Sequence, residues 1–344
     1  MNGLDVIANL LIILITLIIL DQASHLTITN AIKVSDITQL GKTAVGFSLL
    51  AFSTSLPELS VAFIAALSIN PLTGESQAAI SVGNVLGSNI VNISLIVGLA
   101  ALIRSLRHPR TVSLIPSFAK EELGSLYFGL FVSSIIPLSL IYIAEASWFV
   151  GLILILIFIF YTYQMSKIRI PPEEGTSVSE DEKKKLKRYI LFMILGVAGV
   201  VISAYFLVES AVAVATFAGL SRALIGATVI AFGTSLPELT LDLRAFLKGH
   251  PSLAFGDIIG SSFINITLIL GITLFVPALL GSPLTIDMRV FQNLVIFSLI
   301  TNLFFWYFLS MGRLSWKEGA IFLFIYLLFL ASTFGAIQLQ PPAT

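Results

Sequence analysis

Long apolar stretches follow one another along almost the whole chain, and short polar segments separate them. About 18 or more mostly apolar residues in succession are enough for a helix to cross a lipid bilayer. The pattern predicts an all-α membrane protein with ten transmembrane helices. The expected boundaries lie near residues 3–20, 43–69, 79–103, 124–144, 147–164, 189–209, 223–247, 253–280, 289–309 and 316–336.

One polar segment is longer than the others and divides the spans into two groups of five. Residues 164–188 contain two prolines together with many acidic and basic side chains, which is typical of a solvated linker. The predicted units are therefore residues 1–163, the hydrophilic linker 164–188, and residues 189–344.

Two segments of the first unit recur in the second. Without gaps, residues 44–67 match 224–247 at 11 of 24 positions, and 81–99 match 254–272 at 8 of 19. The repeated regions are thus about 44–99 and 224–272. Because each unit has an odd number of spans, the second unit enters the membrane from the opposite side. The sequence therefore predicts two inverted five-helix repeats, an architecture typical of transporters with a midplane site and alternating access.

Composition agrees with a multi-pass protein embedded in the lipid bilayer. Of the 344 residues, 57% are hydrophobic and 11% are charged, whereas soluble domains are about 25% charged. No basic patch with interleaved aromatic residues indicates a nucleic-acid partner. The chain has no cysteine, which excludes thiolate metal sites.

The distribution of basic residues predicts the orientation. With linker 164–188 in the cytoplasm, 17 of the 19 Lys and Arg residues fall on the cytoplasmic side, and only Arg222 and Arg289 lie outside. Cytoplasmic loops of membrane proteins carry an excess of Lys and Arg. We therefore expect a cell-membrane protein with both termini extracytoplasmic.

The phrase TSLPEL occurs in spans 2 and 7 and places a proline near the middle of each. Pro57 and Pro237 have no N–H and clash with the preceding turn, so both spans are expected to break there. Leu56 and Leu236 are expected to leave helical geometry because a proline follows each of them. Carbonyl groups freed at this depth need a cavity or a partner, and a cation is one such partner.

Glu58 and Glu238 follow these prolines directly. A carboxylate at the bilayer centre is costly and usually functional. No Lys or Arg lies near the middle of any predicted span, so a mobile cation is the expected counter-charge. Further oxygen donors beside the two carboxylates are the hydroxyls of Thr54, Ser55, Thr234 and Ser235.

Spans 3 and 8 supply polar residues at a spacing of four, which places each pair on one helical face. The pairs are Ser88 with Asn92 and Ser261 with Asn265. Interhelical hydrogen bonding is the alternative role for these side chains. The paired glycines of the same spans (Gly83 with Gly87, and Gly256 with Gly260) predict close helix approach. The combined donors are all hard oxygens, which suit Ca²⁺ or Na⁺ better than a transition metal.

At these residues the chain resembles the Na⁺/Ca²⁺ exchangers of the cation/Ca²⁺ exchanger superfamily, prokaryotic type. The motifs that carry the resemblance are FSTSLPEL…GNVLGSNIVN and FGTSLPEL…GDIIGSSFIN. The resemblance implies one Ca²⁺ site flanked by Na⁺ sites, and sliding of spans 1 and 6 across the other eight. It implies Glu58 and Glu238 as central ligands, helped by Thr54 and Thr234. The implied Na⁺ ligands are Ser55, Ser88, Ser235, Ser261 and the carbonyls of Ala51 and Ala231, with Asn92 and Asn265 facing the centre.

The chain also departs from that family pattern. Exchangers of the archaeal type carry an aspartate at one of the two final motif positions, but here both Asn92 and Asn265 are amides. The second copy has Asp257 where asparagine is common. This leaves Na⁺ and H⁺ open as the driving ion. Asp21 and Asp242 are interpreted as interfacial residues, with titration as the alternative.

The leading hypothesis is a secondary antiporter that exports Ca²⁺ in exchange for Na⁺, with no cofactor and with a monomer sufficient. The nearest alternative is an H⁺-coupled exchanger of Ca²⁺ or another cation with the same fold. A cation channel is a remote alternative, since channels usually gain symmetry by oligomerising. An enzyme is not expected, because neither GxSxG nor HExxH occurs in the chain.

Overall fold

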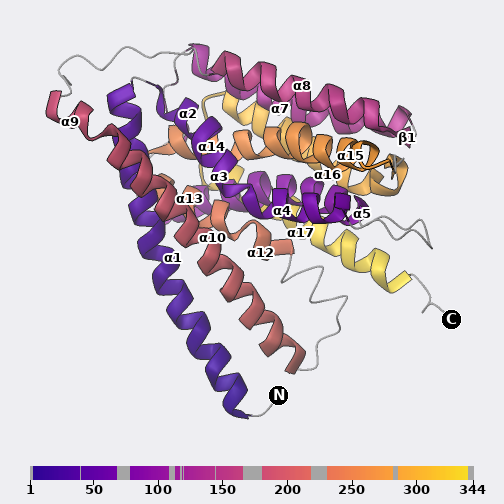
Figure 1. Ribbon diagram of the computed structural model, residues 1–344, viewed down its shortest axis with the longest axis horizontal. Coiled ribbons are helices and arrows are strands. Elements are labelled where there is room, and N and C mark those ends of the chain that lie inside the picture. The colour runs from indigo at the N-terminus through magenta and orange to yellow at the C-terminus, as the bar shows by residue number, and fades with distance from the viewer. Residues whose placement is uncertain are drawn as a thin grey trace.

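The computed structural model describes residues 3–38, 40–67, 78–107, 113–116, 118, 120–143, 145–165, 180–217, 231–281 and 286–339. Within these ranges the protein is almost entirely helical, and eight helices are long and apolar enough to cross a membrane. Most helices run roughly alongside one another, while α1 and α10 form a slanted pair across them (Figure 1).

Helix α1 (Gly3–Thr38) has 36 residues and continues far beyond the predicted end of span 1 at residue 20. The prediction was wrong because polar side chains need not end a helix. Ser24 and Asn30 donate back to the carbonyls of Leu20 and Leu26 at 2.7 Å, so their polar groups stay satisfied.

The partner of α1 is α10 (Leu186–Phe217), and the two helices pack closely along their length. A Cβ atom on Gly196 would lie 2.4 Å from Thr27 Oγ1, which shows how closely the backbones approach. Asp21 does not end a span but lies within α1, where it forms an ion pair with Arg244 of α13 (Leu236–Leu247).

The first TSLPEL phrase lies in a helix that is divided into short pieces. These are α2 (Lys42–Val45), the π-helical η1 (Gly46–Leu50), α3 (Ala51–Thr54) and α4 (Leu56–Leu67). The second phrase lies in α12 (Ala231–Thr234) and α13. The beginning of the seventh predicted span, residues 223–230, lies outside the described residues.

Both phrases bend at the serine rather than at the leucine that precedes proline. Ser55 has φ −78° and ψ 8°, and Ser235 has φ −90° and ψ 7°. Leu56 and Leu236 begin the following helices, so the expectation that they leave helical geometry was wrong. Proline is accepted in the first helical turn, which is why the helix restarts around it.

Spans 3 and 8 share an unpredicted feature, a π-helical turn at equivalent positions. The first consists of α5 (Ala78–Ile90), η2 (Val91–Ile96) and α6 (Val97–Arg107). The second consists of α14 (Pro251–Ile264), η4 (Asn265–Ile269) and α15 (Leu270–Leu279). Such turns occur mostly inside α-helices and often at functional sites.

The other long helices lie close to the predicted spans. They are α7 (Lys120–Ile143), α8 (Trp148–Met165), α16 (Gln292–Ser310) and α17 (Trp316–Leu339). Strands β1 (Glu145–Ala146) and β2 (Ile286–Asp287) pair antiparallel, and the 3₁₀ turn η5 (Met288–Phe291) follows β2. Helix α9 (Glu180–Lys184) and the start of α10 occupy the end of the predicted linker. Residues 166–179 lie outside the described residues.

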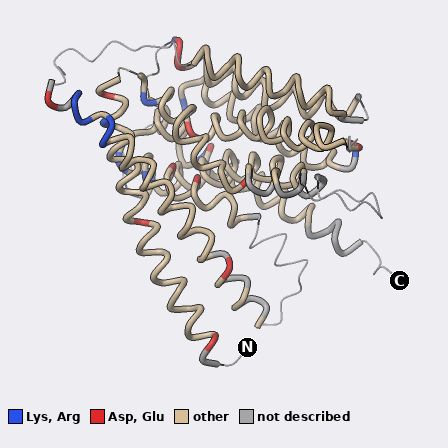
Figure 2. The backbone as a smooth tube through the Cα atoms, in the orientation of Figure 1, with Lys and Arg blue, Asp and Glu red and all other residues tan. Residues whose placement is uncertain are grey.

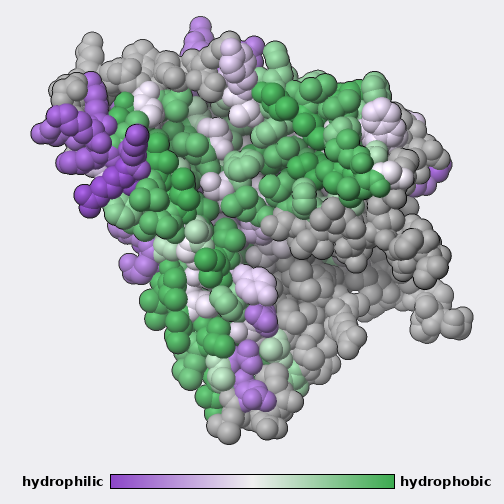
Figure 3. All heavy atoms as spheres, in the orientation of Figure 1, coloured by the Kyte–Doolittle hydropathy of each residue, from purple (hydrophilic) through white to green (hydrophobic). Residues whose placement is uncertain are grey.

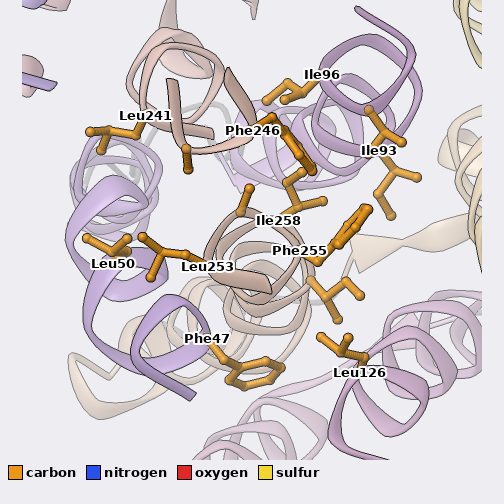
Figure 4. Close-up of a cluster of buried hydrophobic side chains, with 14 of the residues drawn as sticks. Phe47, Leu50, Ile93, Ile96, Leu126, Leu241, Phe246, Leu253, Phe255 and Ile258 are labelled. Carbon is orange, nitrogen blue, oxygen red and sulfur yellow. The ribbon is translucent and has the colours of Figure 1, made fainter. Parts of the chain in front are cut away.

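Helix α14 lies at the centre of the largest buried apolar cluster. Its Leu253, Phe255 and Ile258 are fully buried, and the neighbouring elements η1 and α13 pack around them. The side chains that these two neighbours contribute are Phe47, Leu50, Leu241 and Phe246 (Figure 4). The helix that carries the GDIIGSS motif of the second repeat therefore lies in the packed interior.

The outer face of the molecule is apolar where α1 and α8 cover it. It is largely hydrophobic over these helices, and hydrophilic residues gather near α9 (Figure 3). Large side chains such as Ile18 of α1 and Phe160 of α8 are 65% and 61% exposed. An apolar outer face is expected where helices contact lipid.

The close helix approach predicted for Gly256 and Gly260 is confirmed. A Cβ atom on Gly256 would lie 2.3 Å from the carbonyl oxygen of Thr43, and one on Gly260 would lie 2.6 Å from that of Phe47. Span 8 therefore packs directly on the backbone of span 2. For Gly83 and Gly87, the equivalent segment of the other half is 223–230, which lies outside the described residues.

We expect Gly260→Ala to destabilise the protein, because the added methyl group would overlap backbone atoms of η1. Overpacking of this kind typically costs about 1–3 kcal/mol. The measurement is the thermal unfolding midpoint of the detergent-purified protein. Gly124→Ala is the matched control, since the described structure has nothing within 4 Å of a Cβ at that position. An unchanged midpoint for Gly260→Ala would contradict the close packing.

Candidate cation-binding site

The two glutamates of the repeated phrase lie buried in the interior. Glu58 and Glu238 are each 1% exposed and are close enough to interact electrostatically. Most Lys and Arg gather toward the end of the molecule that carries α9, whereas several acidic positions lie among the helices (Figure 2). The ion pairs found among the described residues include neither glutamate.

One half-site joins the glutamate of the first phrase to the hydroxyls of the second. Ser88 Oγ donates to Glu58 Oε1 at 3.2 Å, and Ser235 Oγ donates to Ser88 Oγ at 3.3 Å. Thr234 lies close to Glu58 as well, and its Oγ1 donates to Asn84 Oδ1 at 3.2 Å. Residues of α4, α5 and the α12–α13 junction therefore meet here.

The other half-site repeats part of this arrangement with the two halves exchanged. Thr54 lies close to Glu238, and its Oγ1 is 3.4 Å from both Ser261 Oγ and Asp257 Oδ1. Thr54 Oγ1 also donates to the carbonyl of Ala51 at 3.3 Å. The threonine of each phrase thus approaches the glutamate of the other.

Many polar atoms around these half-sites are buried and make no hydrogen bond to any residue that the structure describes. Buried polar atoms almost always have a partner, so such a concentration requires an explanation, and a bound ion is one. Both carboxylate oxygens of Glu238 and the second oxygen of Glu58 are in this state. The same is true of Ser55 Oγ, Asn92 Oδ1, Asn265 Oδ1, Asp242 Oδ2 and Asp257 Oδ2.

The two asparagines differ in their contacts. Asn265 Nδ2 donates to Asn89 Oδ1 at 2.9 Å, and Asn89 Nδ2 donates to the carbonyl of Ser262 at 3.4 Å. Asn92 is equally buried, but neither polar atom of its side chain has a partner in the part of the chain that the structure describes. The amide of Asn265 is therefore fixed by a neighbour, whereas that of Asn92 is not.

The structure brings most of the predicted site residues into two adjoining groups. The first group contains Glu58, Ser88, Thr234 and Ser235, and the second contains Ala51, Thr54, Glu238 and Ser261. Ser55 is buried, and the backbone of Ala231 begins α12.

Sequence reasoning did not assign Asn84 and Asn89 to this region, and it treated Asp257 only as a departure from a motif. The signal was present in the repeat, because Asn84 aligns with Asp257 and Asn89 with Ser262. Polar residues at equivalent positions of two apolar spans indicate equivalent contacts.

The oxygen donors of the region suit a hard cation. Among the described residues, no group of three or more His, Cys, Asp or Glu side chains is placed to hold a metal ion. An ion bound here would therefore need hydroxyl, amide or carbonyl oxygens in addition to the carboxylates. Mixed oxygen donors of this kind suit Ca²⁺ and Na⁺.

Comparison with known proteins gives a consistent result. The family model described as sodium/calcium exchanger protein matches residues 8–167 and 188–335. The chain is 30% identical over 357 residues to the sodium/calcium exchanger MaX1 of Methanosarcina acetivorans, covering 95% of this chain and 98% of that one. It is 31% identical over 274 residues to the inner membrane protein YrbG of Escherichia coli, covering 76% and 78%. A solved structure of the sodium-calcium exchanger NCX_Mj superposes with a TM-score of 0.77 at 25% identity, covering 95% of this chain and 99% of that one.

Proposed function

Because the chain belongs to the sodium/calcium exchanger family, we propose that it exports Ca²⁺ in exchange for Na⁺ at the buried site. Family membership makes it a multi-pass membrane transporter rather than an enzyme. The observation that carries the proposal is the group of buried, unpartnered oxygens around Glu58 and Glu238. Two carboxylates balance one divalent cation, and Na⁺ can take the same oxygen donors.

The architecture in this proposal has ten transmembrane helices in two inverted repeats. Eight continuous helices qualify by length, and the segments 42–67 and 231–247 are interrupted helices that supply the other two. The exchanged contacts of Thr54 with Glu238 and Thr234 with Glu58 support the inversion. Such contacts are expected when a pseudo-twofold axis relates the two phrases.

Alternating access then requires one group of helices to move against another. The slanted pair α1 and α10 is the natural moving element, since these helices pack mainly on each other. The ion pair between Asp21 and Arg244 joins α1 to α13, the helix that carries Glu238. Movement of α1 would therefore be transmitted through α13 to Glu238.

The proposed orientation places the α9 end of the molecule in the cytoplasm and both termini outside. Most Lys and Arg gather toward that end, in agreement with the positive-inside rule (Figure 2). Ca²⁺ export would then run from this end toward the end that carries β1 and β2.

The proposal is tested by Ca²⁺ flux in proteoliposomes under an imposed Na⁺ gradient or an imposed pH gradient. We expect an outward Na⁺ gradient to drive Ca²⁺ uptake, and a pH gradient alone to drive none. Empty liposomes give the background. Uptake driven by the pH gradient and indifferent to Na⁺ would contradict Na⁺ coupling and favour an H⁺-coupled exchanger. Absence of uptake under either gradient would contradict Ca²⁺ exchange.

A further inference from the structure

We propose that Asp242 and Asp257 form an additional Na⁺ site beside the half-site of Thr54, an inference that rests on the proposed function. Asp257 lies on α14 one turn before Ser261, and Asp242 lies on α13 one turn after Glu238. The two carboxyl groups are within hydrogen-bonding reach of each other. Asp242 is 1% exposed and Asp257 is 0% exposed.

Unpartnered oxygens point to a ligand between these helices. Among the described residues, the Oδ2 atoms of both aspartates have no hydrogen-bond partner, and neither have the two oxygens of the neighbouring Glu238. Thr54 Oγ1, at 3.4 Å from Asp257 Oδ1, adds a hydroxyl donor from the other repeat. Buried oxygens from three helical segments therefore converge where the described residues offer fewer hydrogen-bond donors than acceptors.

The charges around Asp242 have one sign. Among the described residues, the charged groups that interact with it are Asp257 and Glu238, which are both acids. The ion pairs of the described residues do not include Asp242 or Asp257. Adjacent buried carboxylates without a positive partner are strongly unfavourable, and a bound cation removes that cost.

The aspartate pair has no counterpart at the equivalent positions of the other repeat. The equivalent of Asp257 in the first repeat is Asn84, and the equivalent of Asp242 is Ala62. The mirror contact, Thr234 Oγ1 to Asn84 Oδ1, involves a neutral amide. Position 84 of the first repeat therefore keeps an oxygen atom but carries no charge. Among the described residues, the two carboxylates beyond the central glutamates lie only at the half-site of Thr54.

The proposed exchange leaves a monovalent ion for the pair. The central glutamates already balance one Ca²⁺, and Na⁺ is the other ion that the proposed function brings to this region. Hard oxygen donors together with single charge indicate Na⁺.

The test is equilibrium binding of ²²Na⁺ to the purified full-length protein without Ca²⁺, in wild type, Asp257→Asn and Asp242→Ala. These substitutions introduce the residues of the other repeat. We expect each variant to bind one Na⁺ fewer than wild type and to show a lower Hill coefficient for Na⁺ in Ca²⁺ flux. Asp181→Asn, an exposed position on α9, is the control for charge removal and is expected to match wild type.

The outcomes separate this inference from the proposed function. Wild-type flux driven by Na⁺, with an unchanged number of bound Na⁺ in both variants, would overturn the aspartate site alone. Absence of Na⁺-driven flux in wild type would overturn the proposed function. If Asp257→Asn does not fold, the aspartate site is tested by comparing Asp242→Ala with the charge-conserving Asp257→Glu. Asp242→Ala should lose a bound Na⁺, whereas Asp257→Glu should keep it.

Discussion

Replacing Glu238 with glutamine is expected to abolish Ca²⁺ transport while the protein still folds and inserts. Glutamine has nearly the same shape but removes one of the two charges that balance the ion. A unit charge at about 4 Å and an effective dielectric constant of about 20 contributes roughly 4 kcal/mol per unit charge of the ion. Loss of that interaction with a divalent ion weakens binding by at least about a thousandfold. The measurement is Na⁺-driven ⁴⁵Ca²⁺ uptake into proteoliposomes.

A second readout separates lost binding from lost folding. Both oxygens of Glu238 lack a hydrogen-bond partner within the described ranges, so the neutral variant should be at least as stable as wild type in cation-free buffer. We expect Ca²⁺ to raise the unfolding midpoint of wild type but not of the variant. Glu58→Gln should behave alike, and Glu121→Gln, an exposed position on α7, is the control. Near-normal uptake in either site variant would refute the assignment.

The sequence predicted residues that lie together in the candidate site, because the features that mark them are local. In the repeated phrase, proline indicates an interrupted transmembrane helix and glutamate indicates a buried charge. Neither inference depends on the rest of the fold. Hydrophobic pattern likewise predicted most spans. It placed the end of span 1 too early, because Ser24 and Asn30 satisfy their polar groups against their own helix.

What could not be predicted depends on contacts between distant segments. The approach of Thr54 to Asp257 joins residues that are 203 positions apart in the chain. The π-helical turns at Val91–Ile96 and Asn265–Ile269 arise in stretches whose pattern is that of an ordinary helix. The bend at Ser55 rather than Leu56 likewise reflects how proline is accommodated in the first turn of α4.

Asn265→Asp is expected to make the fold depend on cations. Asn265 Nδ2 donates to Asn89 Oδ1, and aspartate cannot donate in its ionised form. Rotating the Asn89 amide to donate to the aspartate would break another hydrogen bond, because Asn89 Nδ2 already donates to the carbonyl of Ser262. An unpaired buried charge costs about 3–5 kcal/mol. Thermal unfolding in Na⁺-free buffer should therefore show a much lower midpoint than wild type.

Added Na⁺ should restore much of this loss, since a ligand at 100 times its dissociation constant stabilises by about 2.7 kcal/mol. Asn92→Asp is the matched control from the other repeat, because the side chain of Asn92 has no hydrogen bond to a described residue that the change could break. Its free energy of unfolding should fall by about 1–3 kcal/mol less than that of Asn265→Asp. This difference is the cost of a disrupted buried hydrogen bond. Equal destabilisation of the two variants, or no added response of Asn265→Asp to Na⁺, would show that the contact with Asn89 does not determine how this position tolerates a negative charge.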